Sequence, residues 1–510
     1  MTALNSALNV EQIYTGCLAQ GAYFISSNGE AVVIDPLRET KPYLDRAEAL
    51  GVQIKYILET HFHADFVSGH VALSKATGAP IVYGPNANPE FETHIANDGE
   101  VLHVGDVTIE VLHTPGHTLE STCYVLRNEA GEYIAIFSGD TLFLGDVGRP
   151  DLAQKAASMT QEDLASILFD SLRTKIMTLP PSITVYPGHG AGSACGKNMS
   201  KETVGTLAEQ LETNYALRAD MTREEFIKEV TDGLGVPPAY FPMNVAMNKK
   251  AIPGAEEVLA EASKAFEPVA FKAMVGEMDA LVLDTRKPDD FAAGHIPGSI
   301  NIGIDGQFAP WVGALIPIDQ TLMIVCESGR EDEVITRLTR VGYDRVLGYL
   351  EGGIATWSQA GLATDTVTRI TATELSKRLA AKPDLNIVDA RKEGEWTAQN
   401  LPQAKNIALD DLNLKFNELP TDSTMHIHCA GGYRSMIYAS ILKSRGIHDL
   451  VDVIGGFGAI KDTPGLETSA YVCPSTLKKL EEEKAAAHSH AVAAGDAPKG
   501  FMGWLKSLLG

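Results

Sequence analysis

The chain has 510 residues, of which 45% are hydrophobic and 21% are charged. These fractions are ordinary for a globular protein, and the length predicts three or four domains. The net charge of −24 argues against a nucleic-acid-binding surface, because phosphate binding needs clustered lysine and arginine. No run approaches the roughly 18 apolar residues of a membrane span, and residues 1–9 lack the features of a signal peptide.

The cysteines indicate a reducing environment. They are scattered without any Cys-x-x-Cys pair, at Cys17, Cys123, Cys195, Cys326, Cys429 and Cys473. This spacing argues against a disulfide framework and against a structural zinc site, and it favours a cytoplasmic location.

The first informative stretch is an apolar run followed by a loop rich in metal-binding side chains. The run at residues 54–58 predicts a buried strand. The loop after it places His61, His63 and Asp65 within five residues. Three later loops also follow apolar runs, and they carry His117, Asp140 and His189. Imidazole and carboxylate groups at such positions indicate a metal site.

The order and spacing of these four loops resemble the metallo-β-lactamase fold over residues 1–252. The resemblance implies an αββα sandwich, in which two sheets pack together and helices cover their outer faces. In hydrolases of this fold the first motif reads His-x-His-x-Asp-His, and its Asp and final His help to hold a second metal ion. Here the final position is Phe66, which has no lone pair. Asp65, His189 and a bridging Asp140 remain, and three ligands suffice for a catalytic zinc, so a dinuclear hydrolase stays open.

Two further motifs are similar to one branch of that family, the persulfide dioxygenases. They are His-Ala-Asp at residues 63–65 and Gly-Arg-Pro-Asp at residues 148–151. Enzymes of this branch use one non-haem iron to oxidise the outer sulfur of a thiol persulfide to sulfite. The resemblance implies one Fe(II) per chain bound by His61, His117 and Asp140, with zinc as the alternative metal. Such a ligand set leaves about half of an octahedron open for substrate and dioxygen.

The same resemblance implies roles for residues around the metal. His63, Asp65 and His189 would lie beside it and support the three main ligands. Arg149 would help to shape the substrate site. The alternative for His63, Asp65 and His189 is a purely structural role.

A thiol follows the last of these loops. Cys195 lies in the segment 192–197, where it can contact substrate near the metal and briefly carry sulfur. Lys197 would favour the reactive thiolate form. The alternative is that Cys195 is a small apolar loop residue, because cysteine often packs as one.

The second half of the chain contains an internal repeat with a period near 104 residues. Asp-x-Arg occurs at residues 284–286 and again at 389–391. Each copy alternates short apolar strands with amphipathic helical stretches, which predicts a small parallel α/β domain. Repeats of this length are duplicated domains. Both copies resemble rhodanese domains.

The second copy has the form of a rhodanese active loop. Cys429 opens a six-residue loop, Arg434 closes it, and a predicted helix follows. Gly431 and Gly432 let backbone amides turn inward, and Tyr433 precedes the arginine. The amides and the helix N-terminus favour a thiolate at Cys429, and Arg434 can pair with anionic sulfur species. The resemblance implies that Cys429 is the persulfide carrier.

The first copy fails this test. Counting back from Arg330 as from Arg434 puts the catalytic position at Val325, so that Cys326 falls one residue late. Glu327 in the same loop would repel an anionic substrate and disfavour a thiolate. We therefore predict a degenerate, inactive domain that spaces or braces the other two. A shift of one residue in this alignment would restore Cys326 as the catalytic position.

We expect four segments along the chain. They are a metallo-β-lactamase-like domain (1–252), a degenerate rhodanese domain (253–367), an active rhodanese domain (368–478), and a linker with a short helix (479–510). One face of that helix is apolar, with Phe501, Trp504, Leu505, Leu508 and Leu509. This stripe favours docking on the protein itself or on a second subunit, and a weak membrane contact is the alternative.

As a whole, the chain resembles persulfide dioxygenase–rhodanese fusion proteins. The resemblance implies oxidation of a thiol persulfide to sulfite, followed by sulfur transfer from Cys429 to give thiosulfate, in sulfide detoxification. The expected partners are a thiol persulfide, dioxygen and sulfite, with no nucleic acid, in a homodimer or homotetramer. The thiol carrier stays open among glutathione, coenzyme A and bacillithiol. Two other functions also stay open: a glyoxalase II-like zinc thioester hydrolase with an accessory sulfurtransferase, and a non-enzymatic sulfur-carrier scaffold.

Overall fold

The structure is a computed structural model that describes residues 8–154 and 158–473. Two compact units make up the chain. Unit 1 comprises residues 1–286 and 302–362, and unit 2 comprises residues 287–301 and 363–510. The apolar stripe predicted near the C-terminus lies outside the described residues. The self-association that was expected to use this stripe therefore stays a prediction.

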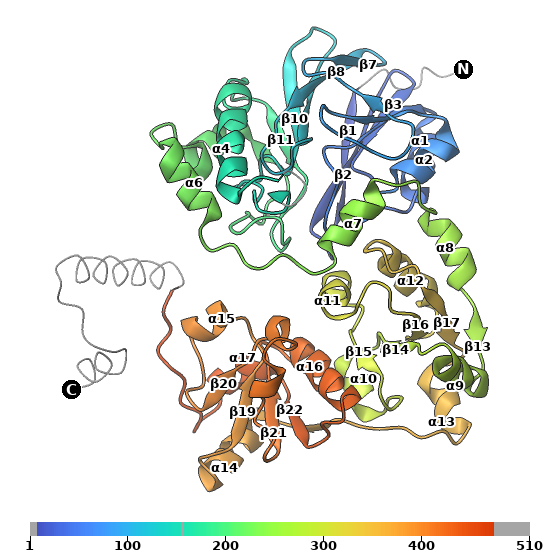
Figure 1. Cartoon of the computed structure of the whole chain (residues 1–510), viewed down its shortest axis with the longest axis vertical. Coiled ribbons are helices and arrows are strands. Elements are labelled where there is room, and N and C mark those ends of the chain that lie inside the picture. Colours follow the sequence, from blue (N-terminus) through green and yellow to red (C-terminus); the bar gives the residue numbers. More distant parts are fainter. Residues whose placement is uncertain (1–7, 155–157, 474–510) are drawn as a thin grey trace, which may run out of the picture. The chain divides into compact units, whose positions relative to one another are not determined.

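Two six-stranded sheets form the first part of unit 1 (Figure 1). The first sheet has the strand order β1–β6, with β1 (Asn9–Thr15), β2 (Gln20–Ser27), β3 (Glu30–Ile34), β4 (Gln53–Leu58), β5 (Ile81–Tyr83) and β6 (His94–Ile95). The second has the order β12-β11-β10-β9-β8-β7, with β7 (Val101–Val104), β8 (Val107–His113), β9 (Thr122–Arg127), β10 (Tyr133–Gly139), β11 (Thr184–Pro187) and β12 (Gly205–Thr206).

One apolar core lies between the two sheets. Ile25 and Leu58 of the first sheet pack in it together with Val111 and Phe137 of the second. Burial of such side chains is the main favourable contribution to folding. Because the inner faces are filled in this way, the loops at the strand ends are the positions left for functional side chains.

Helices cover the outer faces of both sheets. In Figure 1, α1 (Lys41–Leu50) and α2 (His70–Thr77) lie outside the first sheet, and α4 (Gln161–Ser171) and α6 (Arg223–Thr231) lie outside the second. Separate apolar clusters join each helical layer to its sheet. The predicted αββα sandwich is therefore confirmed.

The helices of this sandwich begin at recognisable signals. Thr160, Thr206 and Thr222 each accept a hydrogen bond from the backbone amide three residues on, which caps the helix that follows. The remaining elements of this part are a π-helical turn (Leu172–Ile176), α5 (Leu207–Thr213), a 3-10 turn (Tyr215–Leu217), α7 (Phe241–Asn248) and α8 (Ala255–Ala262).

Unit 1 also contains most of the first repeat. Four parallel strands have the order β13-β17-β16-β14. Its elements are β13 (Ala265–Phe266), α9 (Pro268–Glu277), β14 (Leu281–Asp284), α11 (Phe308–Leu315), β16 (Leu322–Val325), α12 (Glu331–Thr339), β17 (Val346–Leu350) and α13 (Gly353–Gln359).

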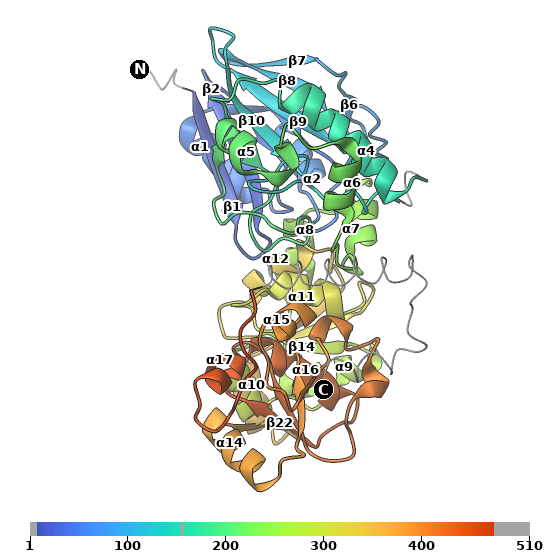
Figure 2. The ribbon, with the colours of Figure 1, turned by 90° about the vertical axis from the view of Figure 1, so that its left-hand side faces the viewer.

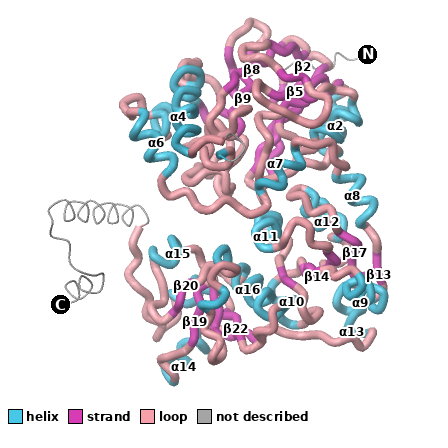
Figure 3. The backbone as a smooth tube through the Cα atoms, in the orientation of Figure 1, coloured by secondary structure: helices cyan, strands magenta, loops and turns pink. Residues whose placement is uncertain are grey.

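Unit 2 contains the second repeat, a parallel sheet with the order β18-β22-β21-β19-β20. Helices flank these strands on both faces (Figures 2 and 3). Its elements are α10 (Pro288–Ala293), β15 (Ile300–Asn301), β18 (Thr368–Ile370), α14 (Ala372–Ala381), β19 (Asn386–Asp389), α15 (Glu393–Ala398), β20 (Ala404–Asn406), 3-10 turns at Leu409–Asp411 and Phe416–Glu418, β21 (Met425–His428), α16 (Tyr433–Ser444), β22 (Leu450–Val453) and α17 (Gly456–Lys461). Among the described residues of both units, no helix has the length and apolar character needed to cross a bilayer.

Candidate metal centre and sulfur-transfer loop

The predicted metal-binding residues converge from loops that follow four strands. His61 follows β4, His117 follows β8, Asp140 follows β10, and His189 follows β11. The nitrogen and oxygen atoms of His61, His117 and Asp140 lie within 4.8 Å of one another, and all three residues are buried. Loops far apart in the sequence thus meet at one place in unit 1.

Asp140 is the central residue of this group. Its Oδ2 lies 3.9 Å from Nε2 of His61 and 3.5 Å from Nε2 of His117. Neither oxygen of the carboxylate has a hydrogen-bond partner among the described residues. A buried charge without partners is costly, so this carboxylate is suited to bind a cation.

Hydrogen bonds orient both imidazoles for metal binding. Nδ1 of His117 donates to the carbonyl of Arg149 at 2.9 Å. Nδ1 of His61 lies 2.9 Å from the hydroxyl of Thr60, which itself donates to Asp35 and therefore accepts from His61. In both rings the lone pair is consequently left on Nε2, which faces Asp140.

The charge state of His61 also suits a metal ligand. Burial, and then the neighbouring histidines His63, His117 and His189, lower the pKa of His61 well below 6.5. The ring is therefore neutral at physiological pH, which is the form that binds metals. Two imidazoles and one carboxylate fit a ferrous ion, and they also fit zinc.

His63 faces away from this group. Its Nε2 lies 3.1 Å from Asp35 and 3.2 Å from Glu59, and its ring stacks on Phe66 at a centroid distance of 4.2 Å. Burial alone would lower the pKa of His63, but the two carboxylates raise it to about 10. His63 is thus a buried cation, and its ion pairs with Asp35 and Glu59 stabilise the metal-binding loop.

Asp65, His189 and Cys195 form a second group beside the first. Their ligand atoms lie within 4.8 Å of one another, and all three residues are buried. Burial, followed by the charges of Asp65 and Asp140, raises the pKa of Cys195 to about 12. The expectation that Lys197 favours a thiolate is wrong, because its ammonium group donates to the backbone carbonyls of Glu229 and Asp232 instead.

Arg149 lies inside the protein, where it holds loops together. Its guanidinium forms a two-point ion pair with Asp151 and donates to the carbonyls of Ala194 and Gly235. Its backbone amide donates to the carbonyl of Cys195 at 3.1 Å. Arg149 therefore holds together the loops around the metal-binding residues. Its role in shaping the substrate site stays a prediction.

Asn248 is a positioning residue that sequence reasoning missed. Its Nδ2 donates to the carbonyls of His63 and Phe66, both at 2.8 Å. Its Oδ1 accepts from the amide of Ser68 at 2.8 Å. Three hydrogen bonds from this one buried side chain therefore fix the backbone of the metal-binding loop. Asn248 ends α7, and no motif surrounds it that would have indicated this role.

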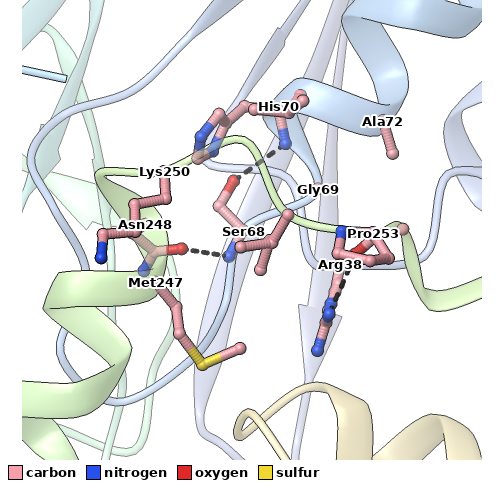
Figure 4. Close-up of a pocket in the computed structure, with 12 residues that line it drawn as sticks. Arg38, Ser68, Gly69, His70, Ala72, Met247, Asn248, Lys250 and Pro253 are labelled. Atoms are coloured by element: carbon pink, nitrogen blue, oxygen red, sulfur yellow. Dashed lines mark hydrogen bonds between the residues drawn. The ribbon is translucent and has the colours of Figure 1, made fainter. Parts of the chain in front are cut away.

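A small cavity beside the metal-binding loop is not a substrate pocket (Figure 4). It is lined in part by Arg38, Ser68, His70 and Asn248, and its volume is about 10 Å³. A space of this size holds about one water molecule. Figure 4 shows Ser68 bonded to Asn248, and Arg38 bonded to Pro253, at its edge.

The candidate sulfur-transfer loop connects β21 to α16 in unit 2. Cys429 is 1% exposed, and its Sγ accepts a hydrogen bond from the amide of Gly432 at 3.1 Å. The hydroxyl of Ser435 lies 3.6 Å from the same sulfur. Gly432 has a φ of 104°, a conformation that favours glycine, and this turns its amide toward the sulfur. The amide and the N-terminus of α16 both favour negative charge on Cys429.

Arg434 is engaged in an ion pair that the sequence did not reveal. Its two terminal nitrogens lie 2.6 and 2.8 Å from the carboxylate oxygens of Glu395, in α15. An anion that binds Arg434 must share it with Glu395. Gly431 is exposed and Tyr433 is half-buried at the start of α16.

Strand pairing corrects the predicted alignment of the two repeats. Asp284 pairs with Val325, and Asp389 pairs with His428, so the residue after each of these strands is a cysteine. Cys326 therefore occupies the same position as Cys429. The segment from cysteine to arginine is one residue shorter in the first repeat, which is why counting back from Arg330 reached Val325.

Comparisons with known proteins agree with this architecture. The family model described as the metallo-beta-lactamase superfamily matches residues 15–189, and the rhodanese-like domain matches residues 267–360 and 371–463. The chain belongs to the metallo-beta-lactamase superfamily. Its domain order confirms the resemblance to persulfide dioxygenase–rhodanese fusions, with two rhodanese-like domains following the metallo-beta-lactamase domain.

Individual relatives carry the names of different enzymes. The mitochondrial persulfide dioxygenase ETHE1 of Homo sapiens is 31% identical over 210 residues, which is 41% of this chain and 73% of that protein. A probable hydroxyacylglutathione hydrolase of Schizosaccharomyces pombe is 31% identical over 186 residues, covering 36% of this chain and 68% of that protein. A metallo-beta-lactamase structure from Staphylococcus aureus subsp. aureus COL has a TM-score of 0.59 at 29% identity, and the match covers 68% of this chain and 99% of that one.

Proposed function

We propose that the chain is a non-haem iron persulfide dioxygenase coupled to a sulfurtransferase. The first activity converts a low-molecular-weight thiol persulfide, dioxygen and water into the thiol, sulfite and two protons. The second transfers a sulfane sulfur to sulfite and gives thiosulfate. The observation that carries the proposal is the presence, in one chain, of the buried His61, His117 and Asp140 group and of the Cys429 loop.

The dioxygenase half rests on the fit of the metal-binding residues. A ferrous ion held by His61, His117 and Asp140 would supply open coordination positions for a persulfide sulfur and for dioxygen. The chain itself keeps both imidazoles in one tautomer through Thr60 and the Arg149 carbonyl. Burial of the group excludes water that would compete for these positions.

The sulfurtransferase half rests on Cys429. Its thiolate attacks the outer sulfur of a second persulfide, which forms a cysteine persulfide and releases the thiol as the leaving group. Sulfite then attacks that outer sulfur, which regenerates the Cys429 thiolate and forms thiosulfate. The Gly432 amide stabilises the thiolate before and after these steps, and Arg434 attracts the anionic acceptor.

A zinc thioester hydrolase of the hydroxyacylglutathione hydrolase kind is the rival. Relatives with that name support it, and so does the 3.6 Å approach of His189 Nε2 to Asp140 Oδ1, because a shared carboxylate suits a metal pair. Against it, Phe66 stacks on His63 and offers no ligand atom. The hydrolase also leaves the Cys429 loop without a part in the reaction.

Oxygen uptake separates these functions. Iron-loaded full-length protein is expected to consume dioxygen when the persulfide of glutathione, coenzyme A or bacillithiol is added, and the best substrate among the three identifies the thiol carrier. Asp140→Ala should abolish uptake because it removes the central carboxylate. Cys429→Ser should keep uptake but shift the product from thiosulfate to sulfite. Thioester cleavage without uptake would favour the hydrolase, and uptake without Cys429-dependent product would exclude the coupled function.

We also propose a cytoplasmic location and a role in sulfide detoxification. The location is supported by Cys17, Cys123, Cys195, Cys326 and Cys429, which are free thiols. The role is supported by the chemistry, which converts persulfide sulfur into thiosulfate. Two sites in one chain also raise the local concentration of sulfite at the second site.

A further inference from the structure

A buried carboxylate that the proposed reaction does not use lies beside the sulfur-transfer loop in unit 2. Asp452 belongs to β22, and its side chain is 0% exposed. In the parallel sheet it pairs with Arg369 of β18 on one side and with Ile427 of β21 on the other. Cys429 is the next residue after β21. The carboxyl ends of these strands meet at one edge of the sheet, so Asp452 and Cys429 share that edge.

The hydroxyl of Ser435, in the first turn of α16, joins Asp452 to Cys429. Its Oγ lies 3.6 Å from Sγ of Cys429, where it accepts the thiol proton. The same hydroxyl is hydrogen-bonded to Asp452, and because a carboxylate only accepts, Ser435 donates to it. Ser435 and Cys429 are both buried, so bulk water does not take the thiol proton directly. The three side chains therefore form one buried path from sulfur to carboxylate.

The charges around Asp452 suit a proton acceptor. Burial raises the pKa of Asp452, and the hydrogen bond from Ser435 and the charge of Arg369 lower it only in part. Nε of Arg369 donates to Asp452 Oδ2 at 2.9 Å. The other end of the guanidinium pairs with the exposed Asp289 of α10, whose negative charge also raises the pKa of Asp452. On the side of β21, Ile427 adds no charge. A carboxylate with a raised pKa accepts a proton more readily than an exposed one.

The first repeat lacks all three polar side chains of this network. Equivalent positions follow from the Gly-Gly pair after each strand, from the strand pairing, and from the arginine that closes each loop. These positions hold Tyr349, Ala265 and Glu331 in place of the aspartate, the arginine and the serine. The network thus accompanies Cys429 and does not accompany Cys326.

We propose that Asp452 is a positioning residue that takes the proton of Cys429 through Ser435. This inference rests on the proposed sulfurtransferase function. The S–H bond of Cys429 breaks as Ser435 Oγ gains that proton, and the proton of Ser435 passes to Asp452. The thiolate left behind attacks the outer sulfur of the persulfide. When sulfite removes that sulfur as thiosulfate, the proton returns to Cys429 by the same path, so the step needs no oxidant or reductant.

The pH dependence of Cys429 alkylation tests this path without using the activity. In the native full-length protein, internal transfer forms a thiolate without loss of a proton to solvent. The rate of iodoacetamide labelling, followed by peptide mass spectrometry, should therefore change by less than about threefold per pH unit between pH 6 and 8. Asp452→Asn keeps the shape of the side chain but takes no proton. Its labelling at pH 6 should be about tenfold slower or more, and should rise about tenfold per pH unit.

Two further variants complete the test. Ser435→Ala should reproduce the result for Asp452→Asn, and the double variant should lose no more than either single one, because the two groups act in series. Asp462→Asn, an exposed change of the same kind after α17, is the matched control and should label like the native protein.

The slope of the labelling rate against pH decides the outcome. A steep slope in the native protein, or a slower rate with an unchanged slope in Asp452→Asn, would overturn the proposal, because a purely structural carboxylate does not alter the slope. If Asp452→Asn does not fold, an unchanged slope in Ser435→Ala would overturn it equally. A native protein with the shallow slope that forms no thiosulfate from glutathione persulfide and sulfite would support the proton path and contradict the proposed sulfurtransferase.

Discussion

Two cysteine loops occupy the same position in the two rhodanese-like domains and differ in the polar groups that surround the thiol. Each cysteine directly follows a strand, and each has a glycine three residues later with positive φ, 86° at Gly329 and 104° at Gly432. The Gly432 amide donates to the sulfur of Cys429, whereas the Gly329 amide donates to the carboxylate of Glu331. The equivalent backbone amide thus donates to a thiol in one domain and to a carboxylate in the other.

The charges around the two loops also differ, with more acidic residues near Cys326 than near Cys429. Helix α12 opens with three acidic residues, Glu331, Asp332 and Glu333, whereas α16 opens without any. Burial first, and then the charges of Glu331 and Asp284, raise the pKa of Cys326 to about 12. The same position in the fold thus gives the two cysteines different electrostatic surroundings. Burial and the acidic first turn of α12 both disfavour a thiolate at Cys326.

The first rhodanese-like domain also contacts the metal-binding loop and its surroundings. Within unit 1, the carbonyl of Arg340 accepts from the amide of Val67, directly in the metal-binding loop. Arg38, whose side chain is 1% exposed, forms a two-point ion pair with Asp344 and donates to the carbonyl of Thr339. The end of α12 therefore braces the metal site.

The largest predicted difference is in sulfur transfer. Cys429→Ser should lower thiosulfate formation from persulfide and sulfite by about a thousandfold or more, because it removes the nucleophile. Cys326→Ser is the matched control and should leave the rate unchanged. Peptide mass spectrometry after persulfide treatment should find one added sulfur on Cys429. A comparable loss of rate in both variants would show that the two loops do not differ as described.

The second prediction concerns the pH dependence of Cys326. With a pKa raised to about 12, its thiolate fraction at pH 8 is roughly one in ten thousand. A raised pKa means that the proton leaves only as the pH rises, so alkylation of Cys326 in the folded protein should increase about tenfold per pH unit from pH 7 to 10. Iodoacetamide labelling with peptide mass spectrometry measures this. A plateau near pH 9 would mean that the surroundings do not suppress the thiolate.

The third prediction tests the bracing role. Asp344→Asn should lower the free energy of unfolding of unit 1 by about 2 kcal/mol, because the buried Arg38 loses a charged hydrogen-bond partner. Asp220→Asn is the control, since its pair with Arg218 is exposed. Chemical denaturation of the metal-free protein gives both values. Equal stability of the two variants would contradict a brace at this position.

The smallest effect is expected from Glu331→Gln. Removing this charge should speed alkylation of Cys326 by less than about tenfold, because burial is the larger cause of its high pKa. Glu277→Gln, an exposed change at the end of α9 in the same domain, is the control. An increase far above tenfold would show that Glu331, and not burial, is the main cause of the raised pKa of Cys326.

The sequence predicted what depends on local pattern. Apolar runs followed by His61, His117 and Asp140 indicated both the sandwich and the three side chains that meet at its edge, because strand ends and their loops are encoded by neighbouring residues. The contact of Asn248 with the metal-binding loop could not be predicted from the sequence, because it joins positions 180 residues apart. The position of Cys326 was misassigned because a deleted loop residue shifts the count from Arg330 without shifting the strand.

The proposed iron ligands come from both layers of the sandwich. His61 follows a strand of the first sheet, and His117 and Asp140 follow strands of the second. A nascent chain therefore has no complete binding site until both sheets have formed and closed on each other. Metal binding is therefore expected late in folding. A local opening that separates the two sheets would release the ion before the chain unfolds globally.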